Sequence, residues 1–259
     1  MTQTERTGRW AGRNAGKDEV RGSAWDRLEE AGVAIGETWS HIPNFVGADM
    51  AAWRLAQTEA WKRASVVKCN PDPPQIPIRL RALYEGKMLY APVPYLTRDF
   101  PYLRIDPAEL KRKGVSFELA ATSEGYMMHG ERVNFEDVEP LDFCVVGSVA
   151  VSRSGGRTGK GAGFADLETG IFRELGIIGP HTPMATTVHS VQLVDDARIF
   201  MQAHDSPLDY VATESELIVT GNTDPRPRGV AWDFVQQDQF ESIPFLGSLR
   251  DRMVAGQQS

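Results

Sequence analysis

The sequence predicts a single α/β domain, built on a mostly parallel sheet with helices on its faces. Its 259 residues can bury a sizeable core, and 41% hydrophobic with 24% charged residues is ordinary globular usage. After residue 64, short apolar runs alternate with stretches of helical periodicity, the order expected of parallel strands joined by helices. Runs such as residues 144–151 are apolar almost throughout, which suits strands buried on both faces. We expect one domain over residues 15–253.

Two helices are predicted at the start of this domain. Across residues 17–34, apolar side chains recur at spacings of three and four, and residues 48–64 repeat the pattern. Residues 41–47 between them contain the Pro, Asn and Gly of a loop. Residues 1–14 carry little apolar content, so we expect them to form a flexible tail, and we expect the same of residues 254–259.

The remaining elements are expected to alternate along the chain. Apolar runs predict strands, and helical patterns separate some of them. The predicted strands are residues 65–69, 88–93, 141–152, 186–194, 208–212 and 217–220, and the predicted helices are residues 76–86 and 163–176. In parallel sheets, ligands bind beyond the carboxyl ends of the strands. The loops to inspect are therefore those that follow Cys69, Val93, Val151, Val194 and Ala212.

Charge and composition exclude several classes of function. Twenty-eight Lys and Arg against 35 Asp and Glu give a net charge of −7, so we expect neither a nucleic-acid nor a membrane partner. Any anion must bind in a local basic pocket. No run of 18 apolar residues occurs and the first 13 residues are polar, which predicts a cytoplasmic protein. Cys69 and Cys144 stand in separate apolar segments and are predicted to be core residues.

A glycine-rich turn follows the apolar run that ends at Val151. Residues 152–163 hold five glycines together with Arg157 and Lys160, and a helix with an apolar face begins directly afterwards. Glycines let the backbone approach an oxyanion and turn its N–H groups toward it, while the helix N-terminus adds a favourable dipole. This order of strand, turn and helix predicts a phosphate site, with a flexible surface loop as the alternative.

Two common nucleotide motifs do not fit this turn. A P-loop needs Gly where Ser154 stands and Ser or Thr where Gly161 stands. A dinucleotide fingerprint needs Gly where Phe164 stands. Phosphate binding is therefore predicted from the chemistry of the turn itself.

The turn resembles the signature of the 5-formyltetrahydrofolate cyclo-ligase family, Arg-x-Gly-x-Gly-x-Gly-aromatic-x-Asp. Residues 157–166 read Arg-Thr-Gly-Lys-Gly-Ala-Gly-Phe-Ala-Asp. Two further features agree in order and spacing: a Lys-x-x-x-Arg at Lys17 and Arg21, and a late His-Asp-x-x-x-Asp-x-x-x-Thr-Glu over residues 204–214. The resemblance covers residues 17–220 and is firm from residue 141 onward.

This resemblance implies a three-layer α/β/α fold like that of ribose-phosphate isomerases and coenzyme A transferases. It also implies an ATP- and Mg²⁺-dependent reaction. Enzymes of the family phosphorylate the formyl oxygen of 5-formyltetrahydrofolate; the neighbouring amine nitrogen attacks the activated carbon, and phosphate leaves to give 5,10-methenyltetrahydrofolate. Such a phosphoryl transfer needs positioning and positive charge rather than a covalent nucleophile.

The resemblance also assigns a nucleotide site. Lys17 and Arg21 lie one helical turn apart and would reach the polyphosphate, although the same spacing describes a solvated helix face. Arg157 and Lys160 would act catalytically by holding the transferred phosphoryl group, with the amides of the glycine turn around it. The implied nucleotide-binding residues are Lys17, Arg21, Arg157, Gly159, Lys160, Gly161, Gly163 and Phe164.

Other positions in the matched motifs are less specific. Asp166 would help hold Mg²⁺, or would merely compensate the helix dipole. His204 and Asp205 would form part of the site wall or a turn that fixes a strand end. His189 fits a hydrogen-bonded strand histidine better than a catalyst.

The sequence departs from the family pattern at two places. Phe164 is followed by Ala165 where the family usually has a second aromatic residue, and residues 67–79 are unlike those of the ordinary enzymes. These features resemble a divergent, cyclo-ligase-like branch, for some of whose members a link to thiamin metabolism has been proposed. Residues 67–79 would read a polar substrate or form a rigid turn in which Asn70 or Asp72 caps a helix. The predicted substrate residues are Lys68, Asn70, Gln75 and Phe164.

Three functions follow from the sequence. The first is ATP-dependent cyclisation of 5-formyltetrahydrofolate with release of ADP and phosphate. The second is an ATP-dependent reaction on a different nitrogen heterocycle, thiamin-related or other, which Ala165 and residues 67–79 favour. The third is a nucleotide-binding module without turnover, against which the joint presence of Lys17, Arg21, Arg157 and Asp166 argues. The acceptor and the oligomeric state are not specified by the sequence.

Overall fold

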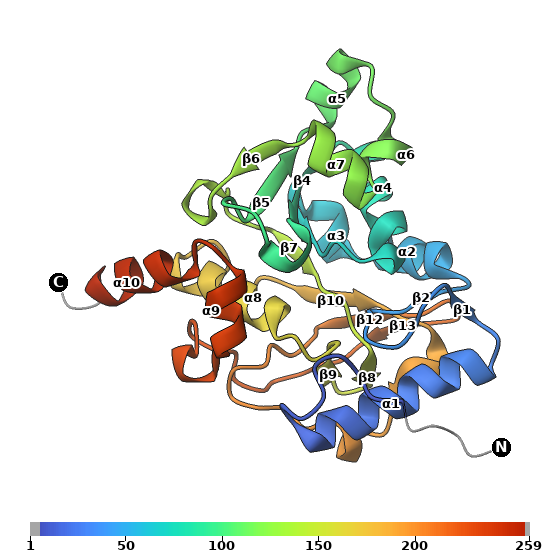
Figure 1. Cartoon of the computed structure of the whole chain (residues 1–259). Coiled ribbons are helices and arrows are strands. Elements are labelled where there is room, and N and C mark those ends of the chain that lie inside the picture. The colour runs from blue at the N-terminus through green and yellow to red at the C-terminus, as the bar shows by residue number, and fades with distance from the viewer. Residues whose placement is uncertain (1–5, 257–259) are drawn as a thin grey trace.

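A mixed sheet of eight strands forms the centre of the molecule, in a computed structural model that describes residues 6–256 (Figure 1). Its strand order is β13-β12-β10-β7-β3-β4-β5-β6. The five central strands run parallel. They are β12 (Tyr210–Ala212), β10 (Met184–Thr187), β7 (Phe143–Val145), β3 (Val66–Cys69) and β4 (Met88–Pro92). Antiparallel strands flank them: β13 (Leu217–Val219) at one edge, β5 (Tyr102–Ile105) and β6 (Glu131–Val133) at the other.

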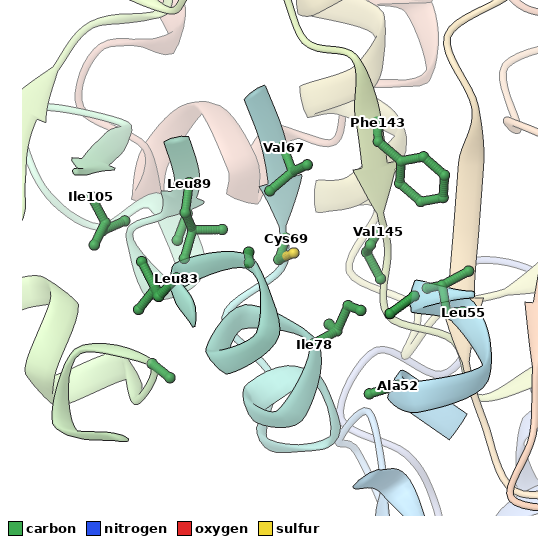
Figure 2. Close-up of a cluster of buried hydrophobic side chains, with 14 of the residues drawn as sticks. Ala52, Leu55, Val67, Cys69, Ile78, Leu83, Leu89, Ile105, Phe143 and Val145 are labelled. Atoms are coloured by element: carbon green, nitrogen blue, oxygen red, sulfur yellow. The ribbon is translucent and has the colours of Figure 1, made fainter. Parts of the chain in front are cut away.

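Helices pack on both faces of this sheet, which confirms the predicted α/β class with a mostly parallel sheet between helical layers. On one face, α2 (Ala48–Ala56) and α4 (Ile76–Tyr84) direct Ala52, Leu55, Ile78 and Leu83 toward the strands (Figure 2). The strands contribute alternate residues to this core, such as Val67. The residues between them face the opposite side, as the two-residue period of a strand requires.

The second core lies on the other face. Here α8 (Phe164–Glu174) packs with the C-terminal helices α9 (Gln237–Ser242) and α10 (Leu246–Gly256) against residues such as Tyr90, Tyr102 and Cys144. Cys69 and Cys144 thus belong to opposite faces, and both are buried and free, as the sequence predicts. Burial raises the pKa of the Cys69 thiol to about 12 and that of Cys144 to about 11.

Two predicted strands are in fact each divided between two sheets. The apolar run at residues 141–152 leaves the main sheet after Val145 and re-forms as β8 (Ala150–Ser152), which pairs with β9 (Arg157–Thr158) and β11 (Leu193–Val194) in a small sheet. The run at residues 186–194 likewise leaves β10 and ends in β11. Apolar character marks burial, and the first run stays buried while the second stays at least partly buried as it changes sheet, so composition alone does not reveal the break.

The helical predictions also need one division and several additions. The segment at residues 48–64 breaks after Ala56, because Thr58 accepts a hydrogen bond from the N–H of Trp61 and starts a separate helix, α3 (Glu59–Arg63). The N-terminal helix is α1 (Ala15–Glu30). No helix or strand is predicted from the sequence between residues 94 and 140, where the structure has short elements. Besides β5 and β6 these are α5 (Pro107–Lys113), α6 (Phe117–Ala120) and α7 (Ser123–His129).

The smallest elements complete the chain. A two-stranded sheet joins β1 (Ala34–Ile35) to β2 (Asn44–Phe45). Short 3₁₀ helices are η1 (Pro73–Gln75), η2 (Pro94–Leu96), η3 (Phe135–Asp137), η4 (Ser190–Gln192), η5 (Asp196–Arg198) and η6 (Trp232–Phe234). No helix among residues 6–256 is long and apolar enough to cross a membrane. The predicted tails fall partly on residues 1–5 and 257–259, which lie outside the described residues, and a single domain over residues 15–253 stays a prediction.

Candidate functional site

A pocket of about 290 Å³ opens at the carboxyl end of the parallel sheet. The residues that follow β3, β4 and β7 contribute Asn70, Val93 and Gly147 to its wall. Four of the five loops that the sequence singled out, those after Cys69, Val93, Val151 and Val194, therefore reach the pocket. The glycine turn, α1 and the segment before α9 supply the remaining walls.

The glycine turn is carried by the small sheet and not by the main one. β8 and β9 form an antiparallel hairpin whose own turn contains Gly155 and Gly156, so these two glycines lie outside the loop that faces the pocket. The pocket loop is residues 159–163, and Gly161 and Gly163 have φ angles of 106° and 77°. Only glycine adopts such angles without strain. Gly163 then caps the N-terminus of α8.

Backbone groups in this turn are used asymmetrically. The carbonyl of Gly159 accepts from Arg21 Nε at 2.7 Å, and that of Ala162 accepts from Gln239 Nε2 at 3.0 Å and from Arg13 at 3.2 Å. By contrast, none of the N–H groups of residues 159–163 donates a hydrogen bond to any other part of the described chain. Neighbouring side chains thus hold the carbonyls and leave a row of amides without partners, which is the arrangement of an anion-binding nest.

Arg157 and Asp166 form a pair beside this turn. Arg157 NH2 donates to Asp166 Oδ1 at 2.6 Å, and the same oxygen accepts from the N–H of Ser206 at 3.2 Å. Burial opposes ionisation of Asp166, but Arg157 and Lys17 outweigh it and hold the pKa of that carboxyl below its ordinary value. Arg157 is 3% exposed, and its buried Nε has no hydrogen-bond partner among residues 6–256.

Lys17 and Arg21 both reach the pocket from α1. Both are buried and line it. The Lys17 ammonium pairs with Asp205, and the Arg21 guanidinium pairs with Asp18 in addition to the carbonyl of Gly159. Burial lowers the pKa of Arg21, and its ion pair with Asp18 opposes that effect.

Lys160 stands at the opposite side of the turn. Its Nζ lies 3.5 Å from Asp72 Oδ1 and 4.6 Å from the centre of the Tyr95 ring. The ring of Tyr95 in turn lies edge-on to Phe164, with 6.1 Å between ring centroids. The position of Ala165 therefore does not leave Phe164 as an isolated aromatic group, because a residue distant in sequence supplies the second ring.

Tyr95 was missed by the sequence analysis and has an unusual backbone. Tyr95 and Leu96 have φ angles of 58° and 54°, which non-glycine residues rarely adopt. Strained backbone of this kind gathers at functional sites, where the surrounding structure enforces it. An aromatic residue after Pro94 is the only signal for it in the sequence, and it is weak.

The predicted substrate residues do not come together. Asn70 and Phe164 line the pocket, whereas Lys68 and Gln75 are fully buried behind it. Lys68 Nζ pairs with Glu168 Oε2 at 2.8 Å and also contacts the Asn70 amide. Neither amide atom of Gln75 has a hydrogen-bond partner in the described part of the chain.

The two uncertain histidine motifs are resolved differently. His204 lines the pocket, and the neighbouring Asp205 both pairs with Lys17 and accepts from the N–H of Gln202 at 2.7 Å, so this motif serves as wall and turn together. His189 lies away from the pocket lining. Its Nδ1 accepts from the N–H of Val191 at 3.2 Å and caps η4.

The pocket also contains a carboxylate that is suited to Mg²⁺. Across residues 6–256 no three His, Cys, Asp or Glu side chains gather into a metal site. Magnesium is usually held by one or two carboxylates together with substrate phosphates and water. Asp166, ionised beside the glycine turn, fits that mode of binding.

The chain is similar to a known protein family and to several known proteins. A family model described as the 5-formyltetrahydrofolate cyclo-ligase family matches residues 13–214. The methenyltetrahydrofolate synthase domain-containing proteins of Bos taurus and Mus musculus are 36% and 37% identical over 236 and 238 residues, covering 90% and 91% of this chain. The chain spans 62% and 63% of the length of these two curated relatives.

Among solved structures, Aquifex aeolicus 5,10-methenyltetrahydrofolate synthetase is similar in fold. The TM-score is 0.51 at 22% sequence identity, and the match covers 81% of this chain and 95% of that one. Residues 229–239, which line the pocket, lie outside the region that the family model matches.

Proposed function

The chain belongs to the 5-formyltetrahydrofolate cyclo-ligase family, and from this premise we propose that it cyclises 5-formyltetrahydrofolate to 5,10-methenyltetrahydrofolate at the expense of ATP. The products besides the methenyl compound are ADP and phosphate. The pocket at the carboxyl end of the sheet is the proposed site.

One observation carries this proposal. The amides of residues 159–163 have no partners, while the carbonyls of Gly159 and Ala162 are held by Arg21 and Gln239. The buried Nε of Arg157 likewise lacks a partner. A buried donor such as Arg157 Nε is costly without an acceptor, and the unpaired amides of the turn line the pocket beside it; a phosphoryl group offers several acceptor oxygens to both. A phosphate cradle accounts for all of these groups together.

The reaction places specific demands on this cradle. The formyl oxygen attacks the γ-phosphorus, and the bond to the bridging oxygen breaks with release of ADP. The neighbouring amine nitrogen then attacks the activated carbon and loses its proton to the departing phosphate or to solvent, and the C–O bond breaks so that phosphate leaves with the former formyl oxygen. Both steps build negative charge on oxygens around phosphorus, so fixed positive groups stabilise the transition states.

The residues can be given roles on this basis. Arg157 and Lys160 hold the transferred phosphoryl group from two sides of the turn, and Lys17 and Arg21 bind the rest of the polyphosphate. Mg²⁺ would neutralise charge between the β- and γ-phosphates. Asp166 would hold it, and the low pKa of that carboxyl keeps it ionised for the purpose.

A second candidate is an ATP-dependent reaction on a different nitrogen heterocycle. It is favoured by the acceptor side, where Lys68 and Gln75 are buried behind the pocket and take no part in its lining. Asn70, Asp72 and Tyr95 remain to contact the acceptor. This set is small, and it does not specify a pteridine over another heterocycle.

The first experiment follows the absorbance of 5,10-methenyltetrahydrofolate when the protein meets 5-formyltetrahydrofolate and Mg-ATP. We expect a rise that requires ATP and that Lys160→Met abolishes, because this change removes a cation from the turn at little cost in volume. Exposed Lys62→Met on α3 is the matched control. Phosphate release from ATP with other heterocycles, but no methenyl product, would decide for the second candidate.

A further inference from the structure

The segment at residues 229–239 closes one side of the pocket, although it lies beyond the family-matched region. It passes over α8 at a point where Gly170 permits contact: a Cβ there would lie 3.0 Å from the carbonyl oxygen of Gly229. The N–H of Val230 donates to Glu174 Oε2 at 3.1 Å. At its other end, Gln239 holds the carbonyl of Ala162 at 3.0 Å. Figure 1 shows α9, which begins at its end, beside α8.

Phe234 is the aromatic group that this segment brings to the pocket. It lines the pocket, yet 54% of it is exposed. Its ring lies against that of His204, with 4.6 Å between centroids and 37° between planes. One side of the ring is therefore fixed by a neighbour, and a large apolar surface is left open beside a phosphate site. Planar heterocycles stack on surfaces of this kind.

The position of Phe234 indicates which heterocycle it meets. His204 is followed by Asp205, whose carboxylate pairs with Lys17, a residue of the proposed polyphosphate site. The proposed acceptor residues Asn70 and Asp72 come instead from the loop after β3. Phe234 thus stands with the group that binds the nucleotide.

We propose that Phe234, backed by His204, is the stacking surface for the purine base of the nucleotide. This inference rests on the proposed function, because it needs ATP at the glycine turn. Asn14 and Gln202, which also line this part of the pocket, carry amide donors and acceptors suited to the edge of a purine. The 229–239 segment is then part of the nucleotide site and not an appendage to it.

The test separates the base from the phosphates. Calorimetric titration with Mg-ATP and, in parallel, with Mg-tripolyphosphate compares a ligand that has the base with one that lacks it. We expect Phe234→Ala to weaken ATP binding by about tenfold, in the range of base–aromatic stacking. Binding of tripolyphosphate stays unchanged, and Phe234→Trp keeps ATP affinity near that of the wild type.

Phe200→Ala is the matched control, since Phe200 is 57% exposed and is not part of the pocket lining. It should bind both ligands as the wild type does. Equal ATP affinity in Phe234→Ala and wild type overturns the inference alone, as does a parallel loss for both ligands, which would mean that Phe234 acts through the shape of the turn. A raised KM for the acceptor with unchanged ATP affinity would move Phe234 to the other substrate. Failure of the wild type to bind ATP overturns the proposed function as well.

Discussion

Two sets of basic side chains lie near the carboxyl end of the sheet, and they are built in opposite ways. We call Arg157 and Lys160 the open set, and Lys68 and Arg79 the closed set. Around the glycine turn, Arg157 and Lys160 face a pocket, and the backbone amides beside them have no partners. Behind the pocket, Lys68 and Arg79 are 0% exposed. Lys68 pairs with Glu168, and Arg79 Nε donates to the carbonyl of Ala121 at 2.7 Å.

The difference teaches how to separate cations that serve a ligand from cations that serve the architecture. Arg79 NH1 also binds the carbonyls of Asn70 and Asp72, so the guanidinium ties the loop after β3 to the helices behind it. Burial lowers the pKa of Arg79, which fits a site built for carbonyl oxygens and without a carboxylate in contact. The glycine turn instead keeps backbone N–H groups that have no hydrogen-bond partner in the described chain. Arg79 NH2 is also a buried donor without a hydrogen-bond partner in the described chain, so unpaired donors that line a pocket, and not unpaired donors alone, mark the place where a ligand binds.

The largest effect is expected where the open set is broken. Arg157→Ala should lower ATP-dependent turnover by at least about 10³-fold, because an arginine on the transferred phosphoryl group contributes on that scale. Phosphate release measures it. Exposed Arg153→Ala in the β8–β9 hairpin, which breaks only the pair with Glu216, is the control and should keep wild-type rates. Wild-type turnover in Arg157→Ala would remove this residue from the site.

Substitutions in the closed set should lower the free energy of unfolding instead of the turnover. Lys68→Met should lower the free energy of unfolding by about 3 kcal/mol, because it leaves Glu168 buried without its cation. Chemical denaturation measures the loss. The double change Lys68→Met with Glu168→Leu should recover only part of it, because it removes the unpaired carboxylate but leaves the Tyr102 hydroxyl, which donates to Glu168 at 2.9 Å, without its acceptor. A variant that keeps its stability but loses affinity for the acceptor would show that Lys68 contacts substrate after all.

The smallest effect is expected at two buried, uncharged amide side chains. Gln75 and Gln192 are both 0% exposed, but Gln75 has neither amide atom paired within the described chain, whereas Gln192 binds Ser148, Val149 and His189. Gln75→Leu should raise the free energy of unfolding by about 1 kcal/mol and leave KM unchanged.

Gln192→Leu serves as the matched variant and should cost about 3 kcal/mol, since it leaves three main-chain groups unpaired. Denaturation curves of both variants give the two values. A raised KM for the acceptor in Gln75→Leu would contradict a purely structural role and place Gln75 in the acceptor site.

Much of the site could be predicted because its chemistry is contiguous in sequence. The glycine turn, its two cations and Asp166 all fall within residues 157–166. Lys17 and Arg21 could be added because a helical turn places them together. The parallel core of the sheet was predictable for a similar reason, since each buried strand is a local apolar run.

Lys68 shows why the rest of the site could not be predicted from the sequence. It lies between Val67 and Cys69 on β3, which face the core shown in Figure 2, so the strand period directs it to the opposite face. There it meets Glu168 of α8, a hundred positions later. No local sequence pattern predicts a partner so distant in the chain. Phe234 was missed for the same reason, because only the tertiary fold returns its segment to the glycine turn.

The carbonyl of Ala162 accepts hydrogen bonds from two residues that lie far apart in the chain, which bears on the order in which the site is assembled. Arg13 comes from the beginning of the chain and Gln239 from near its end. During synthesis, the glycine turn emerges long before the second of these partners. We therefore expect a partly made chain that lacks residue 239 to form the sheet and the core before the glycine turn has all of its contacts.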